Sequence, residues 1–281
     1  MWQNSYDGSP SVYLVPTPIG NLEDMTFRAI NILKEVEVIF SEDTRVTSLL
    51  LNHFEIKTPM TSYHEYNKVD KAKYLVNEML NGKNIALITD AGTPGISDPG
   101  EDLVRRCYEN GIEVESVPGP TAVLTALAIS GMKSGRFCFE GFLSVNKQSR
   151  RIHLNEVKKE KRTMIFYEAP HKLKNTLKDM YEYFGDRNIS LCRELTKIHE
   201  TVMRTSLKGA IDYFEVENPR GEYVLILAGL EKEKEKQPVT LEQAVMLAKE
   251  LVDKGASVNE AAKTIAAETG IKKSLIYKEL L

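Results

Sequence analysis

Short β-rich runs alternate with helical patterns through the first half of the chain, and this alternation constrains the fold most strongly. Strands that alternate with helices form βαβ units and a mostly parallel sheet, which binds ligands at the carboxyl ends of its strands. Helical patterns lie at about 24–36, 68–81 and 101–110, and in the first of them Phe27, Ile30 and Leu33 are expected to share a buried face. The runs with strand character are Ser11–Thr17, Val36–Phe40, Ile85–Thr89 and Glu113–Val117.

A second α/β block is expected after a break at Gly131–Gly135. Strand-like runs recur there at Arg136–Phe142, Thr163–Tyr167, Ile189–Arg193 and Tyr223–Ala228. We therefore predict an α/β fold with one domain at 11–131 and another at 136–230. A charged segment, 231–239, is interpreted as a linker to a helical tail at 240–281, and its first seven residues, Glu231–Gln237, include no apolar residue.

The tail has the spacing of a helix-turn-helix. Capping boxes are expected at Thr240 and Ser257, and Gly255 and Gly270 stand where helix C-termini favour a left-handed residue. Lys272 and Lys273 would face outward on the last helix and could hold a nucleic-acid backbone, although a plain helical dimerisation cap fits equally well. The residues expected to pack inward are Ala262, Ile265, Ala266, Ile271, Leu275 and Ile276.

Composition excludes several classes of protein. The chain is 27% charged and lacks an apolar run of about 18 residues or a signal-peptide pattern, so a cytoplasmic location without a membrane span is expected. Cys107, Cys138 and Cys192 are odd in number and far apart, which argues against a disulfide framework and a zinc site; no metal is expected. The net charge of −3 counts against a protein that coats nucleic acid, but a cluster of basic residues within 147–162 offers a local basic surface.

Three turns rich in proline and glycine each follow a predicted strand. The chain has neither a G-x-G-x-x-G after its first strand nor a phosphate-binding Walker loop, which argues against dehydrogenases and NTPases. Glycines let a ligand approach the backbone closely, so these turns are candidates for binding a polar cofactor. They are Pro16–Leu22, Asp90–Gly100, which holds three glycines and two prolines in eleven residues, and Pro118–Ala122.

The chain resembles the tetrapyrrole methylase superfamily in these three turns and in three further segments, Ser41–Arg45, Phe166–His171 and Cys192–Lys197. The resemblance covers roughly Val12 to Leu230 and is strongest to the branch that methylates small-subunit ribosomal RNA. It implies two α/β domains, a parallel sheet followed by a mixed one, with S-adenosylmethionine in the cleft between them, and a homodimer. The implied activity is 2′-O-methylation of a cytidine ribose in small-subunit (16S) ribosomal RNA.

The same resemblance assigns candidate cofactor-binding residues in both domains. In the first domain these are Pro18, Asp90, Ala91, Gly92, Thr93, Thr121 and Ala122. In the second domain they are Phe166, Tyr167, Pro219 and Gly221.

Methyl transfer to a ribose hydroxyl requires alignment of oxygen, methyl and sulfur and a group that takes the hydroxyl proton. Glu42 or Asp43 could accept that proton, and Arg45 could hold a phosphate or fix the acid. The ordinary alternative is an acidic helix N-terminus with a surface ion pair. His64 and Asn67 are further candidates for substrate contact.

Two other functions remain open at this point. The first is a methylase of a tetrapyrrole precursor or another small molecule. The second is a non-enzymatic regulator that senses a ligand and binds nucleic acid through the helical tail.

Overall fold

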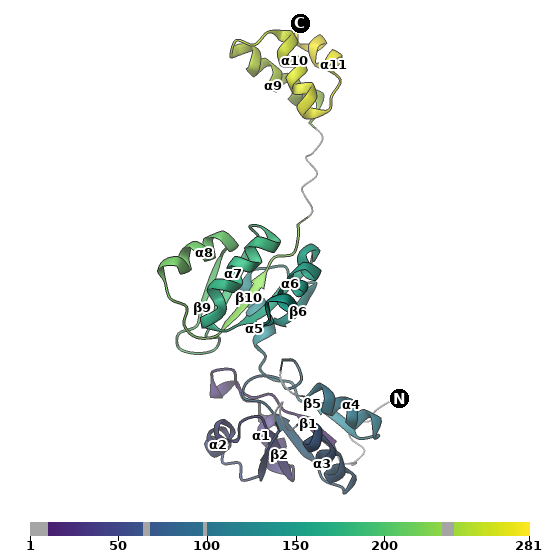
Figure 1. Cartoon of the computed structure of the whole chain (residues 1–281), viewed down its shortest axis with the longest axis vertical. Helices are drawn as coiled ribbons and strands as arrows, with labels where there is room; N and C mark the ends of the chain where they lie inside the picture. Colours follow the sequence, from purple (N-terminus) through teal and green to yellow (C-terminus); the bar gives the residue numbers. More distant parts are fainter. Residues whose placement is uncertain (1–10, 64–67, 98–99, 232–238) are drawn as a thin grey trace. The chain divides into compact units, whose positions relative to one another are not determined.

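The computed structural model describes residues 11–63, 68–97, 100–231 and 239–281 (Figure 1). The chain divides into two compact units, Met1–Leu230 and Glu231–Leu281. None of the helices in the described ranges is long and apolar enough to cross a membrane.

The first sheet has five parallel strands in the order β3-β2-β4-β1-β5, which confirms the predicted parallel sheet. Its strands are β1 (Ser11–Leu14), β2 (Val38–Ser41), β3 (Met60–Ser62), β4 (Ile85–Ile88) and β5 (Glu113–Ser116). A 3-10 turn, η1 (Leu22–Asp24), precedes the helices that connect or follow the strands: α1 (Phe27–Glu35), α2 (Thr44–His53), α3 (Lys68–Leu80), α4 (Glu101–Glu109) and α5 (Ala122–Ser130).

Strand β4 is buried along its whole length, which explains its uninterrupted apolar sequence. Ile85 and Leu87 pack in one core cluster with Leu75 of α3 and Leu103 of α4. The alternate residues of β4 pack in a second cluster with residues of α1 and α2. Helices thus cover both faces of the first sheet, as Figure 1 shows.

Helix α1 corrects one expectation. Phe27 was predicted to share its buried face, but it is 90% exposed. The helix begins at Phe27, after Thr26, whose hydroxyl accepts a hydrogen bond from the Ala29 amide at 3.1 Å. The buried stripe runs through Ala29, Ile32 and Leu33. Phe27 precedes Ala29 by two residues, or about 200° around the helix, so it points away from the core.

The second sheet has the order β6-β7-β10-β8-β9. Strands β6 and β7 are parallel and the other pairs are antiparallel, so the predicted mixed sheet is also confirmed. Its strands are β6 (Phe137–Phe142), β7 (Thr163–Glu168), β8 (Asn188–Arg193), β9 (Thr201–Ser206) and β10 (Tyr223–Leu227). Its helical segments are α6 (Lys147–Glu156), the 3-10 turn η2 (Val157–Lys159), α7 (Pro170–Phe184) and α8 (Leu207–Val216).

Helix α5 links the two sheets. It follows the last strand of the first sheet, yet Val123 and Leu127 pack with Ile165 and Val224 of the second. The guanidinium of Arg204 on β9 donates from Nε to the carbonyl of Ser130 at the end of this helix, at 3.1 Å. The opposite face of the second sheet is covered by α7 and α8. The start of α5 therefore lies where segments of the two sheets meet.

The second unit consists of α9 (Leu241–Asp253), α10 (Val258–Thr269) and α11 (Lys273–Leu280) around a small apolar core. Both predicted capping boxes are present, at Thr240 and Ser257, and Gly270 is left-handed with φ of 74°. The expectation for Leu275 is wrong, because it is 47% exposed. Its neighbour Ile276 occupies the core position, and successive helix residues point about 100° apart.

Candidate functional site

A cavity of about 400 Å³ is lined by segments that follow strands of both sheets. Of the predicted residues, eight line it: Glu42, Asp90, Ala91, Gly92, Thr93, Thr121, Ala122 and Tyr167. Six others do not: Pro18, Asp43, Arg45, Phe166, Pro219 and Gly221. His64 and Asn67 lie outside the described residues, and Lys272 and Lys273 are exposed in the second unit.

The turn after β4 is tied to the other two glycine-rich turns. Thr17 and Gly92 exchange both backbone hydrogen bonds, each at 3.0 Å, so the turns after β1 and β4 are joined. The Thr93 hydroxyl donates to the carbonyl of Pro120 at 3.0 Å, which joins the turn after β5. Gly92 has φ of +82°, a conformation that favours glycine. The three motifs therefore form one wall of the cavity.

The N-terminus of α5 opens onto this wall. Thr121 is its N-cap residue, but no side-chain hydrogen bond caps the helix, and Thr121 and Ala122 both line the cavity. The first amides of a helix have no intrahelical partner, and the helix dipole makes this end partly positive. Such an end binds carboxylate or phosphate oxygens.

Asp90 is the carboxylate of this wall with a raised pKa, and burial is the main cause. The backbone amide of Asp43 donates to Asp90 Oδ1 at 3.1 Å, which orients the carboxylate and partly opposes the rise in its pKa. A carboxylate in this position favours a positively charged ligand.

Asp43 and Arg45 lie beside the cavity wall and interact with each other. Asp43 is the N-cap of α2, and its Oδ1 accepts the Arg45 amide at 2.9 Å. Its Oδ2 accepts the Arg45 guanidinium at 2.6 Å, and the Arg45 side chain is 89% exposed. The bonds from Arg45 lower the pKa of Asp43 to about 2. A carboxylate with so low a pKa is a poor proton acceptor.

The wall from the second sheet contains ionic residues that the sequence motifs include but to which no role was assigned. Lys197 Nζ lies 3.1 Å from Glu194 Oε1, which also accepts the Glu222 amide at 3.1 Å. Glu194 and Thr196 have left-handed backbones, with φ of 52° and 65°. Non-glycine residues in this region cost about 1–3 kcal/mol and cluster at functional sites.

This loop also touches the turn after β1. A Cβ on Gly20 would lie 2.5 Å from Lys197 Cγ and 2.8 Å from the carbonyl oxygen of Leu195. Only a residue without a side chain fits between the two segments. Glycine at this position therefore lets the turn after β1 and the loop after β8 approach closely beside the cavity.

Glu168 is the buried carboxylate of the second wall. Its Oε1 accepts the Ala169 amide at 2.8 Å and its Oε2 accepts the Thr176 hydroxyl at 2.5 Å. Phe166, two residues earlier, is fully buried in the core with α7. Tyr167 points to the opposite face of β7, because side chains alternate along a strand, and it lines the cavity.

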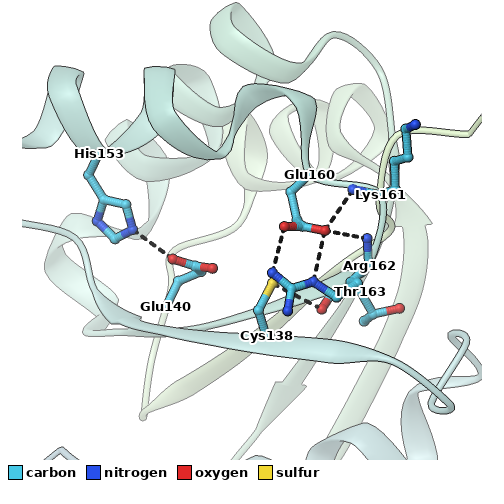
Figure 2. A network of polar contacts seen from close by, with 7 residues as sticks. All are labelled: Cys138, Glu140, His153, Glu160, Lys161, Arg162 and Thr163. Atoms are coloured by element: carbon cyan, nitrogen blue, oxygen red, sulfur yellow. Dashed lines mark hydrogen bonds and ion pairs between the residues drawn. The ribbon is translucent and has the colours of Figure 1, made fainter.

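The basic cluster within 147–162 is partly neutralised by neighbouring carboxylates. Figure 2 shows Arg162 held by Glu160, whose Oε2 lies 2.7 Å from a guanidinium nitrogen. In the same view His153 contacts Glu140 at 2.9 Å. Arg150 lies 2.5 Å from Asp179. These ion pairs weaken the basic surface that the sequence indicated.

Comparisons with known proteins agree with this architecture. The family model "Tetrapyrrole (Corrin/Porphyrin) Methylases" matches residues 11–211. Among solved structures, the methyltransferase CobJ superposes with a TM-score of 0.60 at 20% identity, covering 79% of this chain and 95% of that one. A uroporphyrin-III-C-methyltransferase from Thermus thermophilus superposes with a TM-score of 0.56 at 19% identity, covering 77% and 93%. Likeness at this level of identity shows the fold.

Relatives named ribosomal RNA small subunit methyltransferase I are much more similar in sequence. The protein from Halalkalibacterium halodurans is 45% identical over 280 residues, which cover 98% of this chain and 97% of the relative. The protein from Thermotoga maritima is 46% identical over 218 residues, which cover 78% of this chain and 98% of the relative. The chain thus belongs to the tetrapyrrole methylases and, among them, to the ribosomal RNA small subunit methyltransferase I family.

Proposed function

We propose that this protein transfers a methyl group from S-adenosylmethionine to the ribose 2′-oxygen of a cytidine in small-subunit ribosomal RNA. The observation that carries the choice of substrate is the 45% identity, over almost the full length of both chains, to a relative named for that RNA. The proposed reaction site is the cavity between two walls. The three glycine-rich turns form one, the glycine-rich wall, and the segment of the second sheet with Glu194 and Lys197 forms the other, the ionic wall.

The cavity fits S-adenosylmethionine in size and in chemistry. Its volume of about 400 Å³ lies within the usual range for small-ligand sites. The open N-terminus of α5 suits the carboxylate of the cofactor, and Gly92 permits close approach to the backbone. Asp90 supplies negative charge for the cationic part of the molecule. When bound, this cofactor supplies a methyl group on a positively charged sulfur.

Proton removal from the ribose hydroxyl is assigned to carboxylates of the cavity wall. Asp90 and Glu42 line the cavity, and the pKa of Asp90 is raised, which makes it a better base than Asp43. Asp43 is then a positioning residue, because its amide holds Asp90 and its side chain caps α2. Arg45 holds the Asp43 carboxylate through two hydrogen bonds from its side chain.

Lys197 is the cation of the opposite wall. Its ammonium group pairs with Glu194 and lines the cavity. A positive charge next to the acceptor oxygen would stabilise the alkoxide character that develops as the proton leaves. Lys197→Met should therefore lower kcat more than it weakens cofactor binding.

Two candidate functions are less well supported. A methylase of tetrapyrrole precursors shares the fold, but solved structures named for such substrates, a uroporphyrin-III-C-methyltransferase and a cobalt precorrin-4 methyltransferase, are only 19% and 16% identical to this chain. A ligand-sensing regulator is not favoured, because the chain belongs to a family of methyltransferases. We keep Lys272 and Lys273 of the helical tail as proposed RNA contacts, since both are exposed.

We also propose that the protein is a cytoplasmic homodimer. Phe27 and Leu49 are 90% and 74% exposed, and exposed large apolar side chains are of the kind that a second copy covers. Light scattering measures the mass in solution. A monomer at micromolar concentration would contradict this part of the proposal.

The decisive experiment maps ribose methylation in small ribosomal subunits from a strain that lacks the gene. Incubation with the purified protein and S-adenosylmethionine should add one 2′-O-methylcytidine. Parallel reactions use deproteinised RNA, which separates naked RNA from the assembled subunit as substrate, and a uroporphyrinogen-type tetrapyrrole. Methylation of the tetrapyrrole without methylation of RNA would refute the proposal.

A further inference from the structure

A second cavity, of about 420 Å³, lies beside the last residue of β8. Its wall includes Arg193, the end of α8 and the segment that leads into β10. It lies mainly on the α8 side of the second sheet, where Leu191 and Phe214 belong to the core cluster. The proposed methyl transfer takes place in the first cavity and leaves this second cavity without a role.

Positive charge dominates its wall. Arg193 and Arg220 both line the cavity, and neither forms an ion pair within 4.0 Å among the described residues. The Nε atom of Arg193 is buried and has no hydrogen-bond partner in the described part of the chain. Glu217 is the one carboxylate among the described lining residues, and it is exposed. A buried donor without an acceptor is costly, so the wall is suited to an anion.

An aromatic ring stands on the same wall. Tyr213 lines the cavity, is 48% exposed, and meets Phe214 edge to face with ring centroids 5.0 Å apart. This contact fixes the ring while leaving part of its surface accessible. Guanidinium groups beside an accessible aromatic ring match the two parts of a nucleotide, its phosphate and its base.

The second cavity adjoins the first. Tyr223 lines both cavities and is paired in register with Arg193 across β10 and β8. Arg193 lines the second cavity and its neighbour Glu194 lines the first. One polynucleotide strand can therefore occupy both cavities if it passes around the end of β8.

We propose that the second cavity is a subsite for a nucleotide that flanks the methylated cytidine. Its phosphate contacts Arg193 and Arg220, and its unpaired base stacks on Tyr213. The subsite rests on the proposed function, because it assumes that the first cavity takes a nucleotide of ribosomal RNA. Its role is to hold the RNA strand in position, so it acts on substrate affinity rather than on the methyl transfer step.

The test is steady-state methylation of small ribosomal subunits from the strain that lacks the gene. Arg220 is exposed, so Arg220→Gln should not disturb folding. It should raise KM for subunits at least fivefold, with kcat within twofold of wild type and unchanged S-adenosylmethionine affinity by calorimetry. The slope of log KM against log salt should fall by about 0.7, the value for one contact to a single-stranded phosphate. Arg220→Lys should recover part of the affinity.

Arg105→Gln is the matched control, because Arg105 is an exposed arginine on α4 outside both cavities. A second pair, Tyr213→Phe and Tyr213→Ala, tests stacking, and only the alanine variant should raise KM. Equal KM values for Arg220→Gln and Arg105→Gln would overturn the subsite while leaving the proposed function intact. A wild-type protein that methylates no RNA would overturn both.

Inorganic phosphate serves as a probe that shows whether the second cavity binds a small anion or RNA. Phosphate that raises Tm in wild type but not in Arg220→Gln, combined with unchanged KM for subunits, would identify a small-anion site and overturn the RNA assignment. If phosphate instead competes with subunits in wild type but not in Arg220→Gln, this result would support the RNA assignment.

Discussion

Replacing Asp43 by asparagine should preserve both stability and methylation, whereas replacing it by alanine should cost stability. The Asp43 side chain caps α2 by accepting the Arg45 amide at 2.9 Å. Asparagine caps a helix about as well as aspartate, while loss of a cap to alanine costs about 1 kcal/mol. For a domain of this size that corresponds to a fall in Tm of about 2–4 °C. The ion pair with Arg45 is exposed and screened by solvent, so it adds little to stability.

Neither the helix cap nor the ion pair of Asp43 should change in strength near neutral pH. Because the pKa of Asp43 is lowered to about 2, its carboxylate stabilises the folded state above the unfolded pKa. This contribution is lost only as the pH falls towards 2. At pH 7 the asparagine variant therefore reports the loss of the ion pair, and its difference from the alanine variant reports capping, without a protonation change in either comparison. The backbone amide that holds Asp90 is retained in both variants.

Thermal unfolding measures the stability of each variant, and single-turnover methylation of small subunits measures its rate of methyl transfer. Asp102→Asn is a matched control, since Asp102 pairs with arginines on α4 away from the cavity. If Asp43 were instead the proton acceptor, Asp43→Asn would keep its Tm and lose about 100-fold or more in rate. That result would refute the assignment of Asp43 as a positioning residue.

Three further predictions concern the cofactor and the tail. Gly92→Leu should abolish S-adenosylmethionine binding in calorimetry, whereas Gly82→Leu should not, although both place a side chain at positive φ and lose about 1–2 kcal/mol of stability; equal affinities would contradict the loop assignment. Affinity for the cationic cofactor should fall as the pH drops through the raised pKa of Asp90, and the fall should be smaller for S-adenosylhomocysteine. If Asp90→Asn showed the same pH dependence of affinity as wild type, Asp90 would not be the group responsible. Truncation after Leu230 should leave cofactor affinity unchanged and flatten the salt dependence of KM by about 0.7 for each lysine that contacts phosphate. A changed mass in light scattering with the same salt slope would identify the tail as a dimer contact.

Most of the first sheet could be predicted because its central strands are continuous apolar runs between helices. Strand β3 could not, since Met60–Ser62 is a three-residue edge strand with no room for a pattern. Strand β9 was also not predicted, because its sequence TVMRTS has only two apolar residues, Val202 and Met203, which are adjacent and so show no alternation. Short edge strands are defined by their neighbours rather than by their own composition.

One wall of the candidate site could be predicted from the sequence, and the other could not. The glycine-rich wall was found because each of its turns follows a predicted parallel strand, and parallel strands end at one edge. The ionic wall was not assigned, because Glu194 and Lys197 reach the cavity only through the order β7-β10-β8, which local patterns do not reveal. Phe166 and Tyr167 differ by one position on β7, and alternation alone cannot tell which of two apolar faces carries a cavity.

The central position of β10 has a consequence for synthesis on the ribosome. Strand β10 (Tyr223–Leu227) is inserted between β7 and β8, although both precede it in the chain. Until residue 227 has emerged, β7 and β8 each present an unpaired strand edge that can join a neighbouring chain. The nascent second domain is therefore exposed to aggregation through most of its translation. A chain that terminates early, before β10, should accumulate as insoluble protein rather than as a smaller soluble domain.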